Sequence, residues 1–88
     1  MKEIEIKLFG AFRKYVPTGK IILQIKDIST VKLLKEKVQE KLLEQSLEYK
    51  GQNLVFESAL ATETEILRDE ELVDGKTSLA LLPPVCGG

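Results

Sequence analysis

The residues best suited to chemistry in this 88-residue chain stand at its C-terminal end, in the segment 83–88. This segment reads Pro-Pro-Val-Cys-Gly-Gly and follows an apolar run. Proline cannot donate to a β-ladder and fixes φ near −65°, so Pro83 and Pro84 should lead the chain out of a sheet in extended form. Gly87 and Gly88 lack a Cβ atom and could enter a channel too narrow for side chains. The pattern predicts a terminal carboxylate that is presented to another protein as a reactant.

The remaining composition argues against a conventional side-chain catalyst. The chain has no histidine and one cysteine. These counts exclude a histidine general base, a Cys/His zinc site and a disulfide framework. We therefore expect a protein that is non-catalytic alone and binds no metal.

Length and charge indicate one small domain. Hydrophobic residues make up 43% of the chain and charged residues 31%. No apolar run reaches the roughly 20 residues of a membrane span, and the first residues lack the apolar core of a signal peptide, so a cytoplasmic protein is expected. Residues 1–50 carry 11 Lys and Arg against 7 Asp and Glu, while residues 51–88 carry 2 against 7. Without interleaved aromatic residues, this basic half does not predict nucleic-acid binding, and no membrane partner is expected.

The first half of the chain shows clear periodicity. Residues 2–9 and 20–26 alternate apolar and polar side chains, which predicts an antiparallel hairpin of half-buried strands. Residues 10–15 break the alternation and predict a short helical turn. Thr30 is expected to cap a helix over residues 31–45, whose apolar stripe recurs every three or four positions and should pack on the sheet.

The second half is less regular. Residues 54–56 and 65–67 predict short strands, residues 59–63 fit a strand or a loop, and residues 72–76 predict a turn. Residues 78–82 are almost entirely apolar, which predicts a strand buried on both faces. Such a strand belongs in the middle of the sheet, beside the first strand. The expected fold class is α+β, a mixed sheet packed on one main helix.

Three stretches of the chain resemble a known family. They are Lys-Leu-Phe-Gly-Ala-Phe-Arg at 7–13, Leu-Val-Asp-Gly at 72–75, and Leu-Leu-Pro-Pro-Val-Cys-Gly-Gly at 81–88. Together they are similar to the small subunit of molybdopterin synthase, a MoaD-like sulfur carrier of the MoaD/ThiS ubiquitin-like superfamily. The resemblance implies a β-grasp domain over residues 1–82 and an extended Gly-Gly tail over residues 83–88.

The resemblance also implies a reaction at Gly88. A ubiquitin-activating-type adenylyltransferase would use ATP to form a glycyl adenylate there, and a sulfur donor would convert it to a thiocarboxylate (1-thioglycine). The tail would then enter the large subunit of molybdopterin synthase and give sulfur to cyclic pyranopterin monophosphate, in molybdenum cofactor biosynthesis. No cofactor is expected to remain bound. The implied assembly contains two small and two large subunits.

Further roles follow from the matched positions. The resemblance assigns tail insertion to five residues: Pro83, Pro84, Val85, Cys86 and Gly87. Phe9 and Leu82 are candidates for an apolar docking patch, with core packing as the alternative for each. Arg13 could pair with an acidic site on a partner or be solvated. Relatives commonly have a small residue such as Thr, Ser or Ala at the position of Cys86, and we interpret this cysteine as a tolerated small side chain.

Three other functions fit the same tail. The protein could carry sulfur for thiamin or for tRNA thiolation. It could be a ubiquitin-like modifier, with Gly88 joined to target lysines by an isopeptide bond. It could also be a passive interaction domain whose tail does not react.

Overall fold

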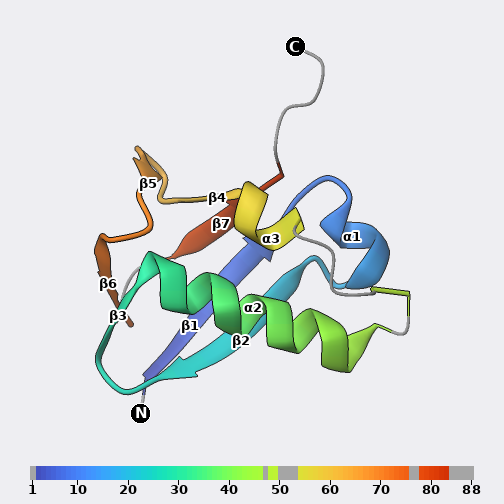
Figure 1. Cartoon of the computed structure of the whole chain (residues 1–88), viewed down its shortest axis with the longest axis horizontal. Helices are drawn as coiled ribbons and strands as arrows, with labels where there is room; N and C mark the ends of the chain where they lie inside the picture. Colours follow the sequence, from blue (N-terminus) through green and yellow to red (C-terminus); the bar gives the residue numbers. More distant parts are fainter. Residues whose placement is uncertain (1, 47, 50–53, 76–77, 84–88) are drawn as a thin grey trace.

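The computed structural model shows a mixed β-sheet with one long helix across one of its faces (Figure 1). It describes residues 2–46, 48–49, 54–75 and 78–83. The sheet has five strands in the order β2-β1-β7-β4-β5. These strands are β1 (Lys2–Leu8), β2 (Lys20–Ile25), β4 (Ala59–Ala61), β5 (Ile66–Leu67) and β7 (Leu79–Leu82). A separate two-stranded sheet pairs β3 (Ile28–Thr30) with β6 (Leu72–Asp74).

The predicted hairpin at the start of the chain is confirmed. β1 and β2 pair antiparallel, with Ile6 opposite Ile21 and Ile4 opposite Leu23. All four side chains are buried, because the apolar residues of both strands alternate with the same phase and so share one face. The predicted helical turn is also present as α1 (Phe12–Tyr15).

The main helix, α2 (Val31–Gln45), has the predicted bounds. Its first turn is capped by the Thr30 hydroxyl, which accepts a hydrogen bond from the Leu33 amide at 3.2 Å. The predicted apolar stripe is buried against the sheet; it consists of Val31, Leu34, Val38 and Leu42. Burial of such side chains contributes about 1.5 to 3 kcal/mol each, so packing of this stripe is the main force holding α2 in place.

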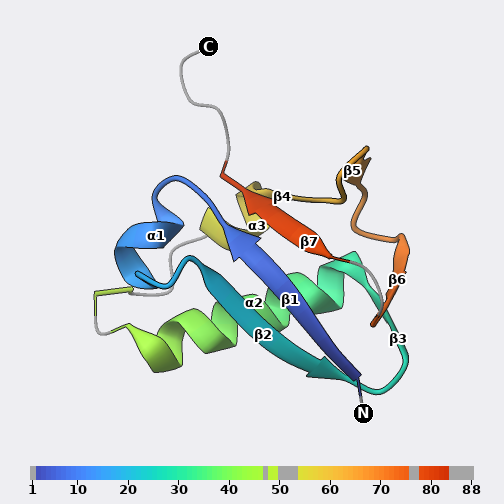
Figure 2. The same ribbon diagram turned by 180° about the vertical axis from the view of Figure 1, so that it is seen from behind.

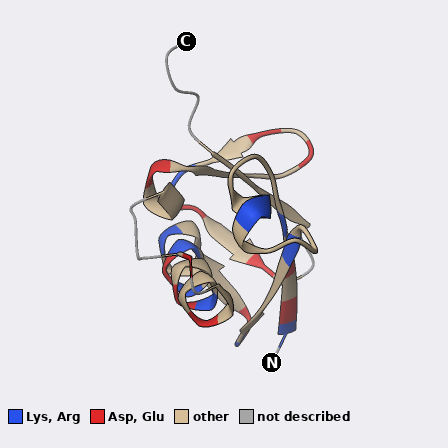
Figure 3. Cartoon of the chain, turned by 90° about the vertical axis from the view of Figure 1, so that its right-hand side faces the viewer, with Lys and Arg blue, Asp and Glu red and all other residues tan. Residues whose placement is uncertain are grey.

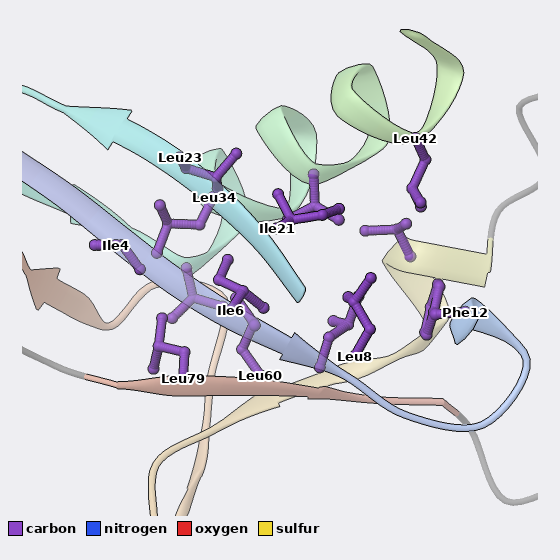
Figure 4. Close-up of a cluster of buried hydrophobic side chains, with 14 of the residues drawn as sticks. Ile4, Ile6, Leu8, Phe12, Ile21, Leu23, Leu34, Leu42, Leu60 and Leu79 are labelled. Carbon is purple, nitrogen blue, oxygen red and sulfur yellow. The ribbon is translucent and has the colours of Figure 1, made fainter. Parts of the chain in front are cut away.

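The core lies between α2 and the sheet (Figure 4). Side chains from β1, β2, β4 and β7 meet the helix stripe there, and Phe12 of α1 closes one end. Tyr15 and Tyr49 extend this end with an edge-to-face contact, their ring centroids 5.1 Å apart. The predicted mixed sheet packed on one main helix is therefore confirmed.

Two predicted elements were wrong. Residues 54–56 form part of a helical turn, α3 (Leu54–Glu57), and not a strand. The Ser58 hydroxyl donates to the Leu54 carbonyl at 2.5 Å and the Ser58 amide donates to the Val55 carbonyl at 3.1 Å, which closes the turn. Residues 72–74, predicted as part of a turn, form β6 because β3 offers them a partner, with Val73 opposite Ser29.

The last strand occupies the predicted central position but is not buried on both faces. β7 runs parallel to β1 and antiparallel to β4. Leu79 and Leu81 are buried, whereas Ala80 and Leu82 are half-buried. The reason is that α2 covers one face of the sheet only (Figure 2). Residues 59–61 resolve as strand β4, and the strand predicted over residues 65–67 is the two-residue β5.

Candidate functional site

Of the C-terminal segment 83–88, the structure describes Pro83, which directly follows the last residue of β7. β1 and β7 are parallel, with Leu8 opposite Leu81, so both strands end at the same end of the sheet (Figure 2). Pro83 follows β7 at this end, and Phe9 and Gly10 follow β1. Of the residues assigned to tail insertion and reaction, Pro84, Val85, Cys86, Gly87 and Gly88 lie outside the described residues.

Gly10 lies directly against Pro83. A Cβ atom added to Gly10 would lie 2.7 Å from Cγ of Pro83, closer than side-chain atoms approach one another. Gly10 also has φ +61°, in the left-handed region where residues with a Cβ atom are strained. The loop after β1 thus packs directly against the first proline of the C-terminal segment; this Gly10–Pro83 contact is called the seat of Pro83 below. The sequence showed Gly10 within a motif but gave it no role, because the contact joins opposite ends of the chain.

Phe9 and Leu82 lie on the sheet face opposite α2. Phe9 is 40% exposed and Leu82 is half-buried, and neither belongs to the buried core. Leu82 stands opposite Ala59 of β4. Both residues thus stay candidates for the predicted docking patch, Phe9 being the more exposed of the two.

A shallow hollow adjoins Phe9 on this face. Its lining includes Phe9, Lys7, Ala61, Glu63 and Ala80. Ala80 pairs with both Lys7 and Ala61 across the sheet, and the two alanine side chains leave room that larger residues would fill. Ala61 and Ala80 were not predicted as site residues. The sequence does show that alanine alternates with leucine in both strands, at 59–61 and at 79–81, which indicates a sheet face lined by small side chains.

Charges of opposite sign lie on different elements of the fold (Figure 3). The last turn of α1 is basic, with Arg13 and Lys14, and the loop between β4 and β5 carries Glu63 and Glu65. Arg13 is exposed, and its guanidinium packs over Gly19, with Nε 3.3 Å from where a Cβ atom of Gly19 would lie. Within the described ranges Arg13 forms no ion pair, so it is available to a partner's acidic group.

Tyr49 has a clearly shifted pKa, and it lies in the core. Burial raises the pKa of Tyr49 above its ordinary value of 10.0, opposed by a hydrogen bond with the backbone of Val55. Its hydroxyl also donates to Oε1 of Gln39 on α2. Tyr49 therefore supports the packing of α2 and is not part of the end of the sheet that carries Pro83.

Clusters of potential metal ligands and membrane-spanning helices are both absent from the described residues. These residues contain no group of three or more His, Cys, Asp or Glu side chains placed to hold a metal ion. None of the helices in the same ranges has the length and apolar character needed to cross a membrane.

Comparison with known proteins identifies the class of fold. No protein-family model matches the chain, and no curated protein matches its sequence. Among solved structures it is similar to SAMP1 of Haloferax volcanii, with 22% identity, a TM-score of 0.69, and coverage of 98% of this chain and 99% of that one. A second structure, of H. volcanii small archaeal modifier protein 1, gives 20% identity, a TM-score of 0.71 and coverage of 97% and 100%.

A third structure, of the Haloferax volcanii HVO 2177 protein, is 22% identical, with a TM-score of 0.68 and coverage of 99% of this chain and 87% of that one. The class of fold is thereby defined: this chain has the ubiquitin-like β-grasp fold. Its structural neighbours are small archaeal modifier proteins.

Proposed function

We propose that this protein is a ubiquitin-like carrier that reacts through the carboxylate of Gly88. The observation that carries the proposal is the seating of Pro83 on Gly10 at the end of β7. This contact fixes the position of Pro83, the first residue of the C-terminal segment, in the same loop region as the exposed Phe9. A fixed starting point lowers the conformational cost of inserting a short segment into a partner's site.

The chemistry of the end group explains why an activating enzyme is needed. An α-carboxyl group has a pKa near 3.5, so Gly88 would be an anion at neutral pH and a poor electrophile. Attack of this carboxylate on the α-phosphate of ATP gives a glycyl adenylate and releases pyrophosphate. A hydrosulfide ion then forms the new C–S bond and loses its proton, and AMP leaves with the electrons of the broken C–O bond. The result is a thiocarboxylate.

The favoured role is sulfur donation as the small subunit of molybdopterin synthase. The Pro-Pro-x-x-Gly-Gly ending supports this role. The partners would be the large subunit, which accepts residues 83–88 and holds the cyclic pyranopterin monophosphate, and a ubiquitin-activating-type adenylyltransferase. Phe9, Leu82 and the hollow beside them offer these partners an apolar contact surface.

A protein modifier is the second candidate. It is supported by the similarity to small archaeal modifier protein 1, which covers nearly the whole of both chains. In this role the activated Gly88 is attacked by a lysine amine of a target protein, and an isopeptide bond replaces the bond to AMP.

Mass measurement of the protein purified from its native cells separates these roles. A sulfur carrier shows a fraction whose mass corresponds to exchange of one oxygen for sulfur. A modifier shows covalent conjugates with larger proteins. Both signals should vanish for a variant that lacks Gly88. If neither species occurs with the intact chain, the passive interaction domain is the correct function and the proposal fails.

A further inference from the structure

No strand that the structure describes pairs with the outer edge of β2. β2 is the terminal strand of the sheet and has six residues, whereas β5 at the other end has two. Open edges are commonly protected by short length, proline or central charges. β2 has lysines only at Lys20 and, just beyond its end, at Lys26, while Ile22 in its middle is 46% exposed.

The hydrogen-bond register shows which groups the edge presents. The Leu8 amide donates to the Gly19 carbonyl at 2.8 Å. Hydrogen-bonded pairs recur at every second residue of an antiparallel ladder, so Ile21 and Leu23 bond with β1. The N–H and C=O groups of the residues between them, Ile22 and Gln24, therefore point away from β1. They are placed to bond with another strand.

A groove runs between this edge and α2. It consists of two adjoining hollows of about 290 and 330 Å³, which share Gln24 and Lys37 in their linings. The second hollow is mostly apolar, with Ile25, Ile28 and Leu33 in its wall. Ile28 is 57% exposed and Leu33 is 44% exposed. This combination of open backbone groups and an apolar wall is what a docking extended peptide requires.

The charged residues around the second, apolar hollow indicate the charge of a suitable partner. Lys26 and Lys37 line it, and no acidic residue does. The first hollow carries Glu40 and Glu44 beside Lys37 and Lys41, so the carboxylates of a bound peptide belong over the second hollow. Neither Lys26 nor Lys37 forms an ion pair with any residue that the structure describes. A second copy of this chain is a poor occupant, because its β2 strand carries Lys20 and no acidic residue that could meet Lys26 and Lys37. Like charges that face each other across strands are destabilising.

We propose that the groove between β2 and α2 binds an extended acidic peptide segment of a partner protein, which adds to β2 as a further strand. Alternate apolar side chains of the peptide lie over Ile25, Ile28 and Leu33, and its carboxylates meet Lys26 and Lys37. The end of β2 that borders this hollow pairs with the start of β1, at the opposite end of the sheet from Pro83. Binding would leave the C-terminal segment free to react.

Two synthetic peptides test the proposal with the full-length chain. Each has seven residues with valine at alternate positions, and two aspartates stand at the N-terminal end in one and at the C-terminal end in the other. Titration into ¹⁵N-labelled protein should give saturable amide shifts at Ile22, Gln24, Leu33 and Lys37. Hydrogen exchange of the Ile22 and Gln24 amides should slow at saturation.

Two variants examine the two parts of the contact separately. Lys37→Glu should weaken binding of the acidic peptide about tenfold or more and favour a peptide with lysines in place of the aspartates. Lys14→Glu makes the same change of charge on α1, outside the groove, and should leave affinity within about twofold. Gln24→Pro removes an outward N–H that β1 does not use, which an edge strand tolerates, and should abolish binding while the spectrum remains that of a folded protein.

Three results would overturn the proposal. One is the absence of saturable shifts with either peptide at concentrations up to about 1 mM, which corresponds to a binding free energy of about −4 kcal/mol. Another is peptide binding that maps to the sheet face around Phe9. The third is a concentration-dependent dimer whose shifts lie along β2, which would make a second copy the occupant.

Discussion

Pro83 packs so closely against Gly10 that a Cβ atom at position 10 would lie 2.7 Å from Cγ of Pro83. The contact joins the loop after β1 to the exit of β7, two strands that run parallel and end at the same end of the sheet. The position of Pro83 is thus set by packing against the loop after β1.

Replacement of Gly10 by alanine should impair both stability and reaction at Gly88. The new Cβ atom adds left-handed strain of about 1 to 2 kcal/mol and displaces Pro83. Gly19→Ala is the matched control, because Gly19 has φ +77° and its Cβ atom would meet only the mobile side chain of Arg13, at 3.3 Å. Urea unfolding should show a loss of stability in both variants. The rate of adenylation should fall in Gly10→Ala alone; equal rates in the two variants would show that the seat has no role in reaction.

Phe9→Ala should weaken docking without unfolding the protein. Because Phe9 is 40% exposed, its removal should change the free energy of unfolding by no more than about 0.5 kcal/mol. As an aromatic anchor of the contact surface, it should raise the KM for the carrier in ATP–pyrophosphate exchange about tenfold with the adenylyltransferase. Phe56→Ala, at 43% exposure on α3, is the control and should leave KM unchanged. An unchanged KM for Phe9→Ala would remove this residue from the interface.

Asp69→Ala should destabilise the protein more than a surface ion pair would suggest. Nζ of Lys35 lies 2.9 Å from Oδ1 of Asp69, and the Lys35 side chain is 7% exposed. Without Asp69 this ammonium group stays buried and unpaired, at a cost of about 1 to 3 kcal/mol in the free energy of unfolding. Asp27→Ala breaks an exposed pair with Lys2 and should cost less than about 1 kcal/mol. Equal urea midpoints for the two variants would contradict the importance of the buried lysine.

The stability contribution of Tyr49 should be lost at alkaline pH. Its folded-state pKa is raised above 10.0 by burial, so the unfolded chain releases the phenolic proton first. The contribution is therefore complete below about pH 10 and declines as pH rises above that value. Tyr49→Phe leaves Gln39 without this donor and should cost about 1 kcal/mol at neutral pH. The difference between the two proteins in urea unfolding should shrink above pH 10; a constant difference would contradict the predicted shift.

Local patterns predicted most of the fold. The alternation in β1 and β2 and the stripe of α2 depend on neighbours in sequence, so they could be read directly. Residues 54–56 are three large apolar residues, which fit a strand or a helical turn equally well, and the Ser58 hydrogen bonds favour the turn. β6 exists only because β3 pairs with it, although α2, α3, β4 and β5 separate the two strands in the sequence. No pattern within residues 72–76 shows that partner.

The candidate site was predictable in its residues but not in its geometry. The diproline and the two glycines are visible in the sequence as a chemical pattern. The seat at Gly10 and the hollow beside Ala80 arise from the parallel pairing of β1 with β7. Contacts between opposite ends of a chain follow from topology, which one sequence does not display.

The most direct test of the account is the mass of the C-terminal peptide after incubation with ATP, the adenylyltransferase and a sulfur donor. We predict exchange of one oxygen for sulfur, located on Gly88, and the same exchange in Cys86→Ser. Addition of sulfur to Cys86, with Gly88 unchanged, would contradict the claim that the terminal carboxylate is the reacting group.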